Sequence, residues 1–341
     1  MAPVTTRRRF APREAPTGPQ PRDPLPDELA EELGALAAAL DQQIPPKQLD
    51  RNLLIATWNI REFGKVNPKW IAEDGEKPER DVFSIRAIAE IVSRFDVVAI
   101  QEVQVNIDAL RMLLRTLGSH WGLILTDATK GDRGDGERLA FVYDTRRAIP
   151  SGLACELVVP DEVLDAGAGE DVLKQQFAKT PYAVAFRSEG NTFILVTLHI
   201  RFGKTKERIP ELNAIAKWMR DWADSTADEL NQNLIALGDF NINNKNDKLY
   251  QAFTSHGLRP PDEFDGKNRT LPTTDGKPKY YDQIAWFTED GDAKLTLGYD
   301  KRAGNFEWDK YVFPGMDRDE VSFRISDHYP LWCEFLLPEH G

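Results

Sequence analysis

From residue 51 onward, apolar runs of strand length alternate with segments of helical period, and this alternation constrains the fold more than any other feature. The run at 52–57 is strand-like, the segment 81–95 places its isoleucines on one helical face, and the run at 96–101 is strand-like again. The pattern also predicts helices at 106–117 (ended by Gly118) and 208–224, and strands at 139–143, 183–187, 193–198, 234–237, 283–287 and 330–336. Long helices beside many short strands favour an α/β (α+β) fold with sheets packed face to face and helices outside.

The first 50 residues differ in composition from the rest. Residues 1–25 are rich in arginine and proline and have almost nothing to bury, which predicts a disordered basic tail. Residues 26–50 are predicted to form an amphipathic helix and a linker, because leucines recur at helical spacing until Pro45-Pro46. We expect this helix to pack on the domain that follows, at 51–338; binding of a partner protein is the alternative.

The overall composition excludes several classes of protein. With 41% hydrophobic and 29% charged residues the chain is globular, and no apolar run approaches the ~18–20 residues of a membrane helix, so no membrane insertion is expected. The net charge of −12 argues against binding polyanions through a global field, but local basic loops can still contact nucleic acid. Two cysteines, Cys155 and Cys333, suit a reducing compartment. We expect a cytoplasmic protein; export through the arginines at 7–9 is the alternative.

Polar residues with chemical function stand at the ends of the apolar strands. Alone, each is more simply explained as a turn former or cap, but together they indicate a ligand site at strand ends. Carboxylate and amide oxygens are preferred Mg²⁺ ligands, and histidines with carboxylate partners suit proton transfer near neutral pH. Zinc is disfavoured, since there is no cysteine cluster and no HExxH motif. The residues are Asn59, Glu102, His199, Asp239 and Asn241 after strands, and Asp282, Asp327 and His328 before strands.

Seven motifs in fixed order carry a resemblance to a known family. They are TWNIREFG (57–64), FDVVAIQEV (95–103), GERLAFVY (136–143), LVTLHI (195–200), ALGDFNI (236–242), YYDQIAW (280–286) and ISDHYPL (325–331). Together they resemble the endonuclease/exonuclease/phosphatase superfamily, and deoxyribonuclease I most closely, over residues 51–338. The resemblance implies a single catalytic domain built as a four-layer α/β sandwich, in which two packed mixed β-sheets are flanked by helices.

The resemblance also implies roles for individual residues. It implies a Mg²⁺ site, at which Mn²⁺ is able to substitute, with Glu102 as principal ligand aided by Asn59, Asp327 and Asp239. The implied catalytic residues are His199 with its partner Glu137, His328 with its partner Asp282, and the pair Asp239 and Asn241. Arg61, Arg138 and Lys179 are the implied contacts to substrate phosphate. Which histidine is the acid and which the base stays open.

The expected activity is metal-dependent hydrolysis of phosphodiester bonds, most simply by a DNA endonuclease that leaves 5′-phosphate and 3′-hydroxyl ends. Two departures from deoxyribonuclease I bear on which substrate is bound. Lys179 replaces a phosphate-contacting arginine, and Asp135 replaces an aromatic residue that lies in the DNA minor groove. The alternatives are a phosphatase or a lipid or nucleotide phosphodiesterase on the same fold, and a catalytically inactive binding protein.

Two basic stretches are candidate contacts to a nucleic-acid backbone, with ordinary solvated loops as the alternative. One precedes Asp282 and the other follows His199. Their residues are Lys267, Arg269, Lys277 and Lys279, and Arg201, Lys204, Lys206 and Arg208.

Overall fold

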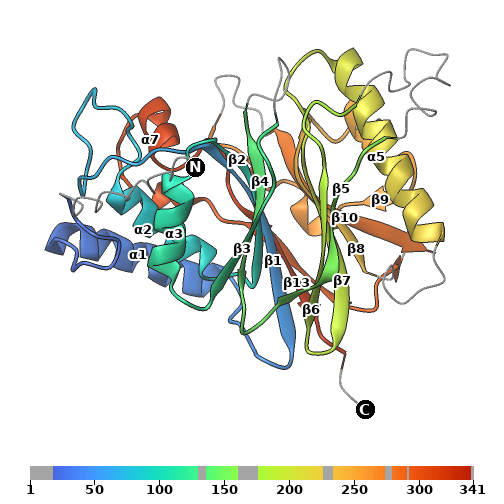
Figure 1. The fold of residues 1–341 in the computed structure, drawn as a ribbon, viewed down its shortest axis with the longest axis horizontal. Helices are drawn as coiled ribbons and strands as arrows, with labels where there is room; N and C mark the ends of the chain where they lie inside the picture. Colours follow the sequence, from blue (N-terminus) through green and yellow to red (C-terminus); the bar gives the residue numbers. More distant parts are fainter. Residues whose placement is uncertain are drawn as a thin grey trace, which may run out of the picture.

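Two mixed β-sheets pack face to face between outer layers of helices in the computed structural model (Figure 1). The structure describes residues 18–129, 136–159, 176–225, 233–272, 279–289 and 292–338. The predicted four-layer α/β sandwich is therefore confirmed. Asp135, Lys277 and most of the predicted tail lie outside the described residues.

The first sheet has six strands in the order β12-β13-β1-β2-β4-β3, with β1 parallel to β2 and the other pairs antiparallel. Helices α1, α2, α3 and α7 lie on its outer side (Figure 1). The strands are β1 (Asn52–Phe63), β2 (Val97–Val103), β3 (Trp121–Leu125), β4 (Arg138–Asp144), β12 (Gly298–Asn305) and β13 (Leu331–Leu336). The helices are α1 (Asp27–Gln43), α2 (Val82–Val92), α3 (Asp108–Leu117) and α7 (Arg318–Arg324).

The second sheet has seven strands, with the path β11-β10-β8-β7-β6-β5 and with β9 paired to β10. Strands β7 and β8 are parallel, and the long helix α5 and the short α6 cover the outer face. The strands are β5 (Ile149–Glu156), β6 (Tyr182–Ser188), β7 (Asn191–His199), β8 (Leu234–Ile242), β9 (Leu258–Arg259), β10 (Tyr280–Glu289) and β11 (Asp292–Ala293). The helices are α5 (Thr205–Ser225) and α6 (Lys248–Thr254), and single 3₁₀ turns occupy Asp262–Phe264 and Trp308–Lys310.

The central strands are buried on both faces, which explains why their sequences are continuously apolar. Along β1, Leu54 and Trp58 pack beneath the helices of the first layer, whereas Leu53 and Ile55 pack against the other sheet. A third cluster fills the space between the second sheet and α5 and α6. The fold thus has one core between the sheets and one on each outer side.

Every predicted helix and strand is present, but several strands are longer than their apolar runs. Strands β1 and β8 continue through Asn59 and Asp239, so the prediction that these residues follow their strands is wrong. Glu102 and Asn241 likewise lie inside β2 and β8. The reason is that pairing uses the backbone, and the neighbouring strands still supply partners at these positions.

The helix predicted between Pro26 and Ile44 is α1, and it buries Leu36 and Leu40 in the core of the first layer. Residues 18–26 lie beside α2, where the Arg86 Nη1 atom donates to the Pro21 carbonyl at 2.8 Å. Both cysteines are free thiols. Within the described ranges, no helix has the length and apolar character that crossing a bilayer requires.

Candidate active site

The strand registers bring most predicted site residues to one edge of the two sheets. His199 of β7 aligns with Asp239 of β8, which aligns with Asp282 of β10. In the first sheet, Asn59 aligns with Gln101, the neighbour of Glu102. Strands β10 and β13 run antiparallel to β8 and β1, so residues at their beginnings reach the edge where β1 and β8 end. Both sheets therefore contribute to one candidate site.

Gly238 makes the close packing beneath the site possible. Its φ is +140°, and a Cβ atom there would stand 2.0 Å from the carbonyl oxygen of Leu198 in β7. Only glycine allows the two parallel strands to approach this closely just before His199 and Asp239.

His328 is held by a buried carboxylate. Its Nδ1 atom lies 2.6 Å from Asp282 Oδ2, which leaves Nε2 as the atom that faces the site. Burial disfavours the charged imidazole, but the charge and hydrogen bond of Asp282 outweigh it and raise the pKa of His328 well above its ordinary value. Burial also raises the pKa of Asp282 to about 6. The pair therefore retains a proton at neutral pH.

His199 is held by a second carboxylate together with a lysine. Its Nδ1 atom lies 3.0 Å from Glu137 Oε2, and Lys179 Nζ lies 2.7 Å from the same oxygen and 3.1 Å from Nδ1. Burial acts to raise the pKa of Glu137, but the hydrogen bond and charge of His199 and the charge of Lys179 lower it to about 2. Burial opposes protonation of His199, yet the Glu137 and Asp239 carboxylates raise its pKa net. Lys179, predicted as a phosphate contact, is thus a buried member of this group.

Asp239 is the point at which the two histidine pairs meet. Its Oδ2 atom lies 3.6 Å from Nε2 of His199 and 4.0 Å from Nε2 of His328. The same oxygen accepts a hydrogen bond of 3.0 Å from Asn59 Nδ2, which also donates to Glu102 Oε1 at 3.0 Å. Both sheets are therefore joined through a single carboxylate.

The oxygen atoms around Asn59 fit a hard divalent cation. Asn59 Oδ1 is buried and has no hydrogen-bond partner among the described residues, and the Glu102 and Asp239 carboxylates flank its amide nitrogen. A buried acceptor without a partner is costly, and a cation removes that cost. Glu102, Asn59 and Asp239 are thus candidate ligands for a divalent cation.

A second set of ligand atoms overlaps with this one. Glu102, Glu137 and His199 each offer one atom, and these atoms lie within 4.8 Å of one another. The ammonium group of Lys179 is already bound to Glu137, so its charge opposes a cation between Glu137 and His199. The oxygen-rich group around Asn59 is therefore the better site.

Backbone strain accompanies the candidate ligands. Glu102 and Asn241 are not glycines, yet their φ angles are +60° and +49°. Asn241 is fixed by its side chain, because Nδ2 donates to the Ile200 carbonyl at 2.6 Å, and its backbone N donates to Asp239 Oδ1 at 2.8 Å. Such conformations persist where the surroundings impose them, and they cluster at functional sites.

Three of the predicted site residues do not bond to the candidate site within the described part of the chain. Two of their side chains bond to other residues, and one makes no bond to any described residue. Arg61 stacks on the Phe323 ring at 3.7 Å and donates to Ser322 Oγ, whereas Arg138 donates to the Thr126 carbonyl. The Asp327 carboxylate makes no hydrogen bond or ion pair within the described ranges, although its charge helps to raise the pKa of His328. Among the described residues, none of these three side chains hydrogen-bonds to Asn59, Glu102 or Asp239.

The structure corrects part of the prediction for the basic stretches. Arg269 is 1% exposed and donates from Nε to the Asp282 carbonyl at 2.8 Å. Arg208 is 5% exposed and donates to the Asn241 carbonyl. Both guanidinium groups hold the backbone of site residues, so the prediction that they form part of exposed loops is wrong.

Three residues for which the sequence predicted no role hold the backbone of His328. The indole nitrogens of Trp58 and Trp308 both donate to its carbonyl oxygen, at 2.9 and 3.1 Å. Ser326 Oγ accepts from the His328 backbone N and donates to the Asn59 carbonyl. Trp58 and Ser326 belong to the sequence motifs and were recognisable there, but nothing in the sequence singles out Trp308.

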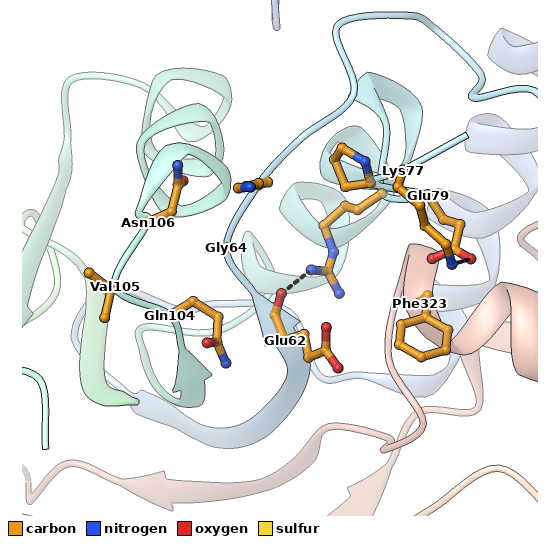
Figure 2. Close-up of a pocket in the computed structure, with 11 residues that line it drawn as sticks. Glu62, Gly64, Lys77, Glu79, Gln104, Val105, Asn106 and Phe323 are labelled. Atoms are coloured by element: carbon orange, nitrogen blue, oxygen red, sulfur yellow. Dashed lines mark hydrogen bonds and ion pairs between the residues drawn. The ribbon is translucent and has the colours of Figure 1, made fainter. Parts of the chain in front are cut away.

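A pocket of about 590 Å³ lies beside Glu102, with Glu62, Gln104 and Phe323 among its walls (Figure 2). The backbone N of Glu62 donates to Glu102 Oε2 at 3.0 Å, which joins the pocket wall to the candidate ligand. Beneath it, the buried Arg80 donates to the carbonyls of Arg61 and Glu62 at 2.5 and 2.8 Å. The pocket is thus a fixed hollow, of a volume that ligand-binding pockets typically have.

Solved structures with the same fold include three of stated identity. The human Nocturnin catalytic domain with bound sulfate is 15% identical, with a TM-score of 0.54, over 84% of this chain and 94% of that one. D. rerio TDP2 complexed with single strand DNA product is 13% identical, with a TM-score of 0.53, over 83% and 98%. Bacteroides thetaiotaomicron mannosyl-6-phosphatase Bt3783 is 17% identical, with a TM-score of 0.52, over 84% and 100%. At these identities the likeness shows the fold.

A family model gives the classification. No curated protein is significantly similar to the sequence. The model of the Endonuclease/Exonuclease/phosphatase family matches residues 56–281, which span Asn59, Glu102, His199 and Asp239. The chain therefore belongs to the Endonuclease/Exonuclease/phosphatase family, whose members are hydrolases that act on phosphoester bonds.

Proposed function

We propose that this chain is a metal-dependent phosphodiesterase that cleaves nucleic acid, with DNA as the first expectation and 5′-phosphate and 3′-hydroxyl ends as products. The arrangement of the two histidines carries the proposal. Each binds a carboxylate through Nδ1, and their Nε2 atoms lie 3.6 and 4.0 Å from the same Asp239 oxygen. Ester hydrolysis needs one group that takes a proton from water and one that gives a proton to the leaving oxygen, and this arrangement provides both.

The remaining roles follow from the same geometry. In the proposal, Asn59, Glu102 and Asp239 hold Mg²⁺, with Asp327 approaching from beside His328. A bound divalent ion supplies neutralisation of the phosphate charge. Glu137 and Asp282 fix the orientation of the imidazole rings, and thereby leave each Nε2 atom to carry the transferred proton.

The proposed phosphate contacts act at different depths. Lys179 supplies positive charge next to His199 from a buried position. In the proposal, Asn241, whose backbone N donates to Asp239 Oδ1, orients the phosphate and the attacking water. Contacts from Arg61 and Arg138 require their guanidinium groups to leave Ser322 and Thr126, which is a testable part of the proposal.

Two observations favour a diester over a terminal phosphate. In the proposal, the pocket beside Glu102 takes a group on the second side of the phosphate, which a monoester does not have. Among proteins with this fold, TDP2 is described with a single strand DNA product. Monoester hydrolysis is the competing function, because a mannosyl-6-phosphatase has the same fold.

Nicking of supercoiled plasmid tests the proposal. The purified chain is incubated with Mg²⁺, with Mn²⁺ and with EDTA, beside His199→Ala and the matched control His120→Ala, whose histidine is exposed and distant from the site. We expect metal-dependent nicking that only His199→Ala abolishes. Hydrolysis of sugar phosphates without nicking would replace the proposal with a phosphatase function, and no hydrolysis of either would favour a binding protein.

A further inference from the structure

The segment after His199 exposes an aromatic ring. Phe202 is 68% exposed, and it is the one exposed aromatic side chain in the ranges that the structure describes. A single exposed hydrophobic residue needs no functional explanation, so a role for Phe202 has to be argued from the residues around it.

Three cations close to Phe202 in the sequence have no partner among the described residues. In the described part of the chain, the side chains of Arg201, Lys204 and Lys206 make no ion pair and no hydrogen bond, although the chain as a whole carries a net charge of −12. The segment 201–208 contains one acidic residue, Glu207, whose carboxylate lies near Gly203. An excess of free positive charge is thus concentrated on this segment.

Backbone contacts tie the segment to the candidate site. The Ile200 backbone N donates to the Asp239 carbonyl at 2.8 Å, and the Ile200 carbonyl accepts from Asn241 Nδ2 at 2.6 Å. Phe202 is therefore two residues away from Ile200, which is hydrogen-bonded to the strand that carries Asp239 and Asn241.

Arg208 connects the ring to the candidate site. Its guanidinium group donates to the Asn241 carbonyl and lies 5.7 Å from the centre of the Phe202 ring. Arg208 is buried in the first turn of α5, so its position is set by the helix. The guanidinium lies on the site side of Phe202, and the exposed part of the ring is available to another planar group.

We propose that this segment binds an unpaired nucleotide next to the scissile phosphate. The base stacks on Phe202, and the adjoining phosphates lie on Arg201, Lys204 and Lys206. This inference rests on the proposed function and names its substrate class, a single-stranded nucleic acid. An aromatic ring among basic residues is typical of single-strand binding, whereas a base within a duplex is already stacked on its neighbours.

An anionic lipid surface also attracts basic residues beside an apolar side chain. The structure favours the nucleotide for two reasons. One ring gives little apolar area for a membrane, and Phe202 lies against the arginine that holds Asn241.

Binding in EDTA separates recognition from hydrolysis. The probe is a single-stranded oligonucleotide of about 15 nucleotides containing 2-aminopurine, whose fluorescence falls on stacking; the comparison is the same length of duplex. The variants are Phe202→Leu and the double variant Lys204→Gln and Lys206→Gln. Ile149→Ala, which alters an exposed side chain of β5, is the matched control.

We expect Phe202→Leu to weaken single-strand binding about 5- to 160-fold, which corresponds to the ~1–3 kcal/mol of one base stacked on an aromatic ring, and to abolish the fluorescence change. The double lysine variant is expected to lower the slope of log affinity against log salt by about 1.4, at ~0.7 per phosphate contact. Ile149→Ala is expected to behave as the wild type.

Three results would overturn the inference: unchanged affinity and fluorescence in Phe202→Leu, an equal loss of binding to duplex, or Phe202-dependent binding to vesicles of phosphatidylserine and phosphatidylcholine in place of the oligonucleotide. Hydrolysis of a generic phosphodiester in Mg²⁺ is measured separately. If the wild type hydrolyses that ester but shows no Phe202-dependent binding, the inference fails and the proposed function stands. If the wild type shows Phe202-dependent single-strand binding but hydrolyses no ester, the inference stands and the proposed function fails.

Discussion

The two ends of strand β2 both carry clustered charge, which is buried at Asp96 and half-buried at Glu102. Asp96 immediately precedes β2 and belongs to a cluster with Arg147, Lys47 and Asp144. Glu102 lies near the other end, in the candidate site. Both clusters have members on the first sheet, at opposite ends of the same strand, so their hydrogen bonding can be compared directly.

At the Asp96 end, the charged groups satisfy one another. Arg147 donates from Nε to Asp96 Oδ1 at 3.0 Å and from Nη1 to the Leu49 carbonyl at 2.6 Å, and the Leu54 backbone N donates to the second Asp96 oxygen at 2.8 Å. Among the described residues, no buried polar atom of this cluster lacks a partner. This end stabilises the fold.

At the Glu102 end, the groups are left incomplete. Asn59 Oδ1 and Asp282 Oδ1 are buried without partners in the described part of the chain, and Glu102 and Asn241 have positive φ angles. Unsatisfied atoms and strain are tolerated where a ligand completes the site. The comparison therefore teaches that incompleteness, and not buried charge as such, marks the functional end.

The largest expected effect is on activity, at the incomplete end. Glu102→Gln should lower turnover about 10⁴-fold, similar to the loss of one member of a catalytic constellation, or about 5.4 kcal/mol of activation free energy. The free energy of unfolding, measured in urea without metal, should stay equal or rise because one of two neighbouring carboxylates loses its charge. Retained turnover would remove Glu102 from the site.

The complementary substitution removes an ion pair at the Asp96 end, where the charged groups satisfy one another. Arg147→Met removes the buried partner of Asp96 and leaves it, among the described residues, only the partly exposed Lys47, at 3.7 Å, so it should lower the free energy of unfolding by about 3–5 kcal/mol, while the folded fraction keeps its turnover. The matched control is Lys217→Met, because Lys217 pairs with Asp221 on the surface of α5 and such pairs contribute about 0.3–0.5 kcal/mol. Equal urea midpoints for the two variants would contradict the comparison.

The sequence predicts the inner strands better than the outer ones, for a physical reason. Every strand that was not predicted lies at or beside a sheet edge: β3 and β12 in the first sheet, and β5, β9 and β11 in the second. An edge strand needs less apolar sequence, and β12 (GYDKRAGN) has almost none. Helices α6 and α7 are seven residues long, too short for a helical period to be recognised.

For the site, the sequence predicts residue types but not their partners. That His199 and Asp239 lie side by side follows from a register between β7 and β8 that the apolar pattern leaves open. The burial of Lys179 between Glu137 and His199, and the two indoles on the His328 carbonyl, depend on segments far apart in the chain. Such contacts are set by tertiary packing and leave no local signal.

A smaller effect concerns acid stability. Glu137 has a pKa lowered from 4.5 to about 2, so its charged form stabilises the folded state at pH values above 4.5. This contribution, about 3 kcal/mol at 1.36 kcal/mol per pKa unit, is lost as the pH falls toward about 2. Urea unfolding of wild type and Glu137→Gln at pH 6, 5, 4 and 3 should therefore converge in acid.

The exposed Glu73 provides the control, since its carboxylate is 77% exposed. The difference in the free energy of unfolding between wild type and Glu73→Gln gives the baseline for an exposed carboxylate over the same pH range. If Glu137→Gln lowers stability equally at every pH, its role is packing and the charge coupling to His199 and Lys179 is absent.

The smallest expected effect is metal-induced stabilisation, which separates the two overlapping ligand sets. At a Mg²⁺ concentration of about 100 times the Kd, the folded state gains about 2.7 kcal/mol. Glu102→Gln should abolish this gain and Arg147→Met should keep it, because the proposed metal ligands lie only at the incomplete end. Glu137→Gln decides between the sets: if Asn59, Glu102 and Asp239 hold the ion, the gain persists, whereas a site formed by Glu102, Glu137 and His199 loses it. Persistence in Glu102→Gln would contradict both sets, since Glu102 is common to them.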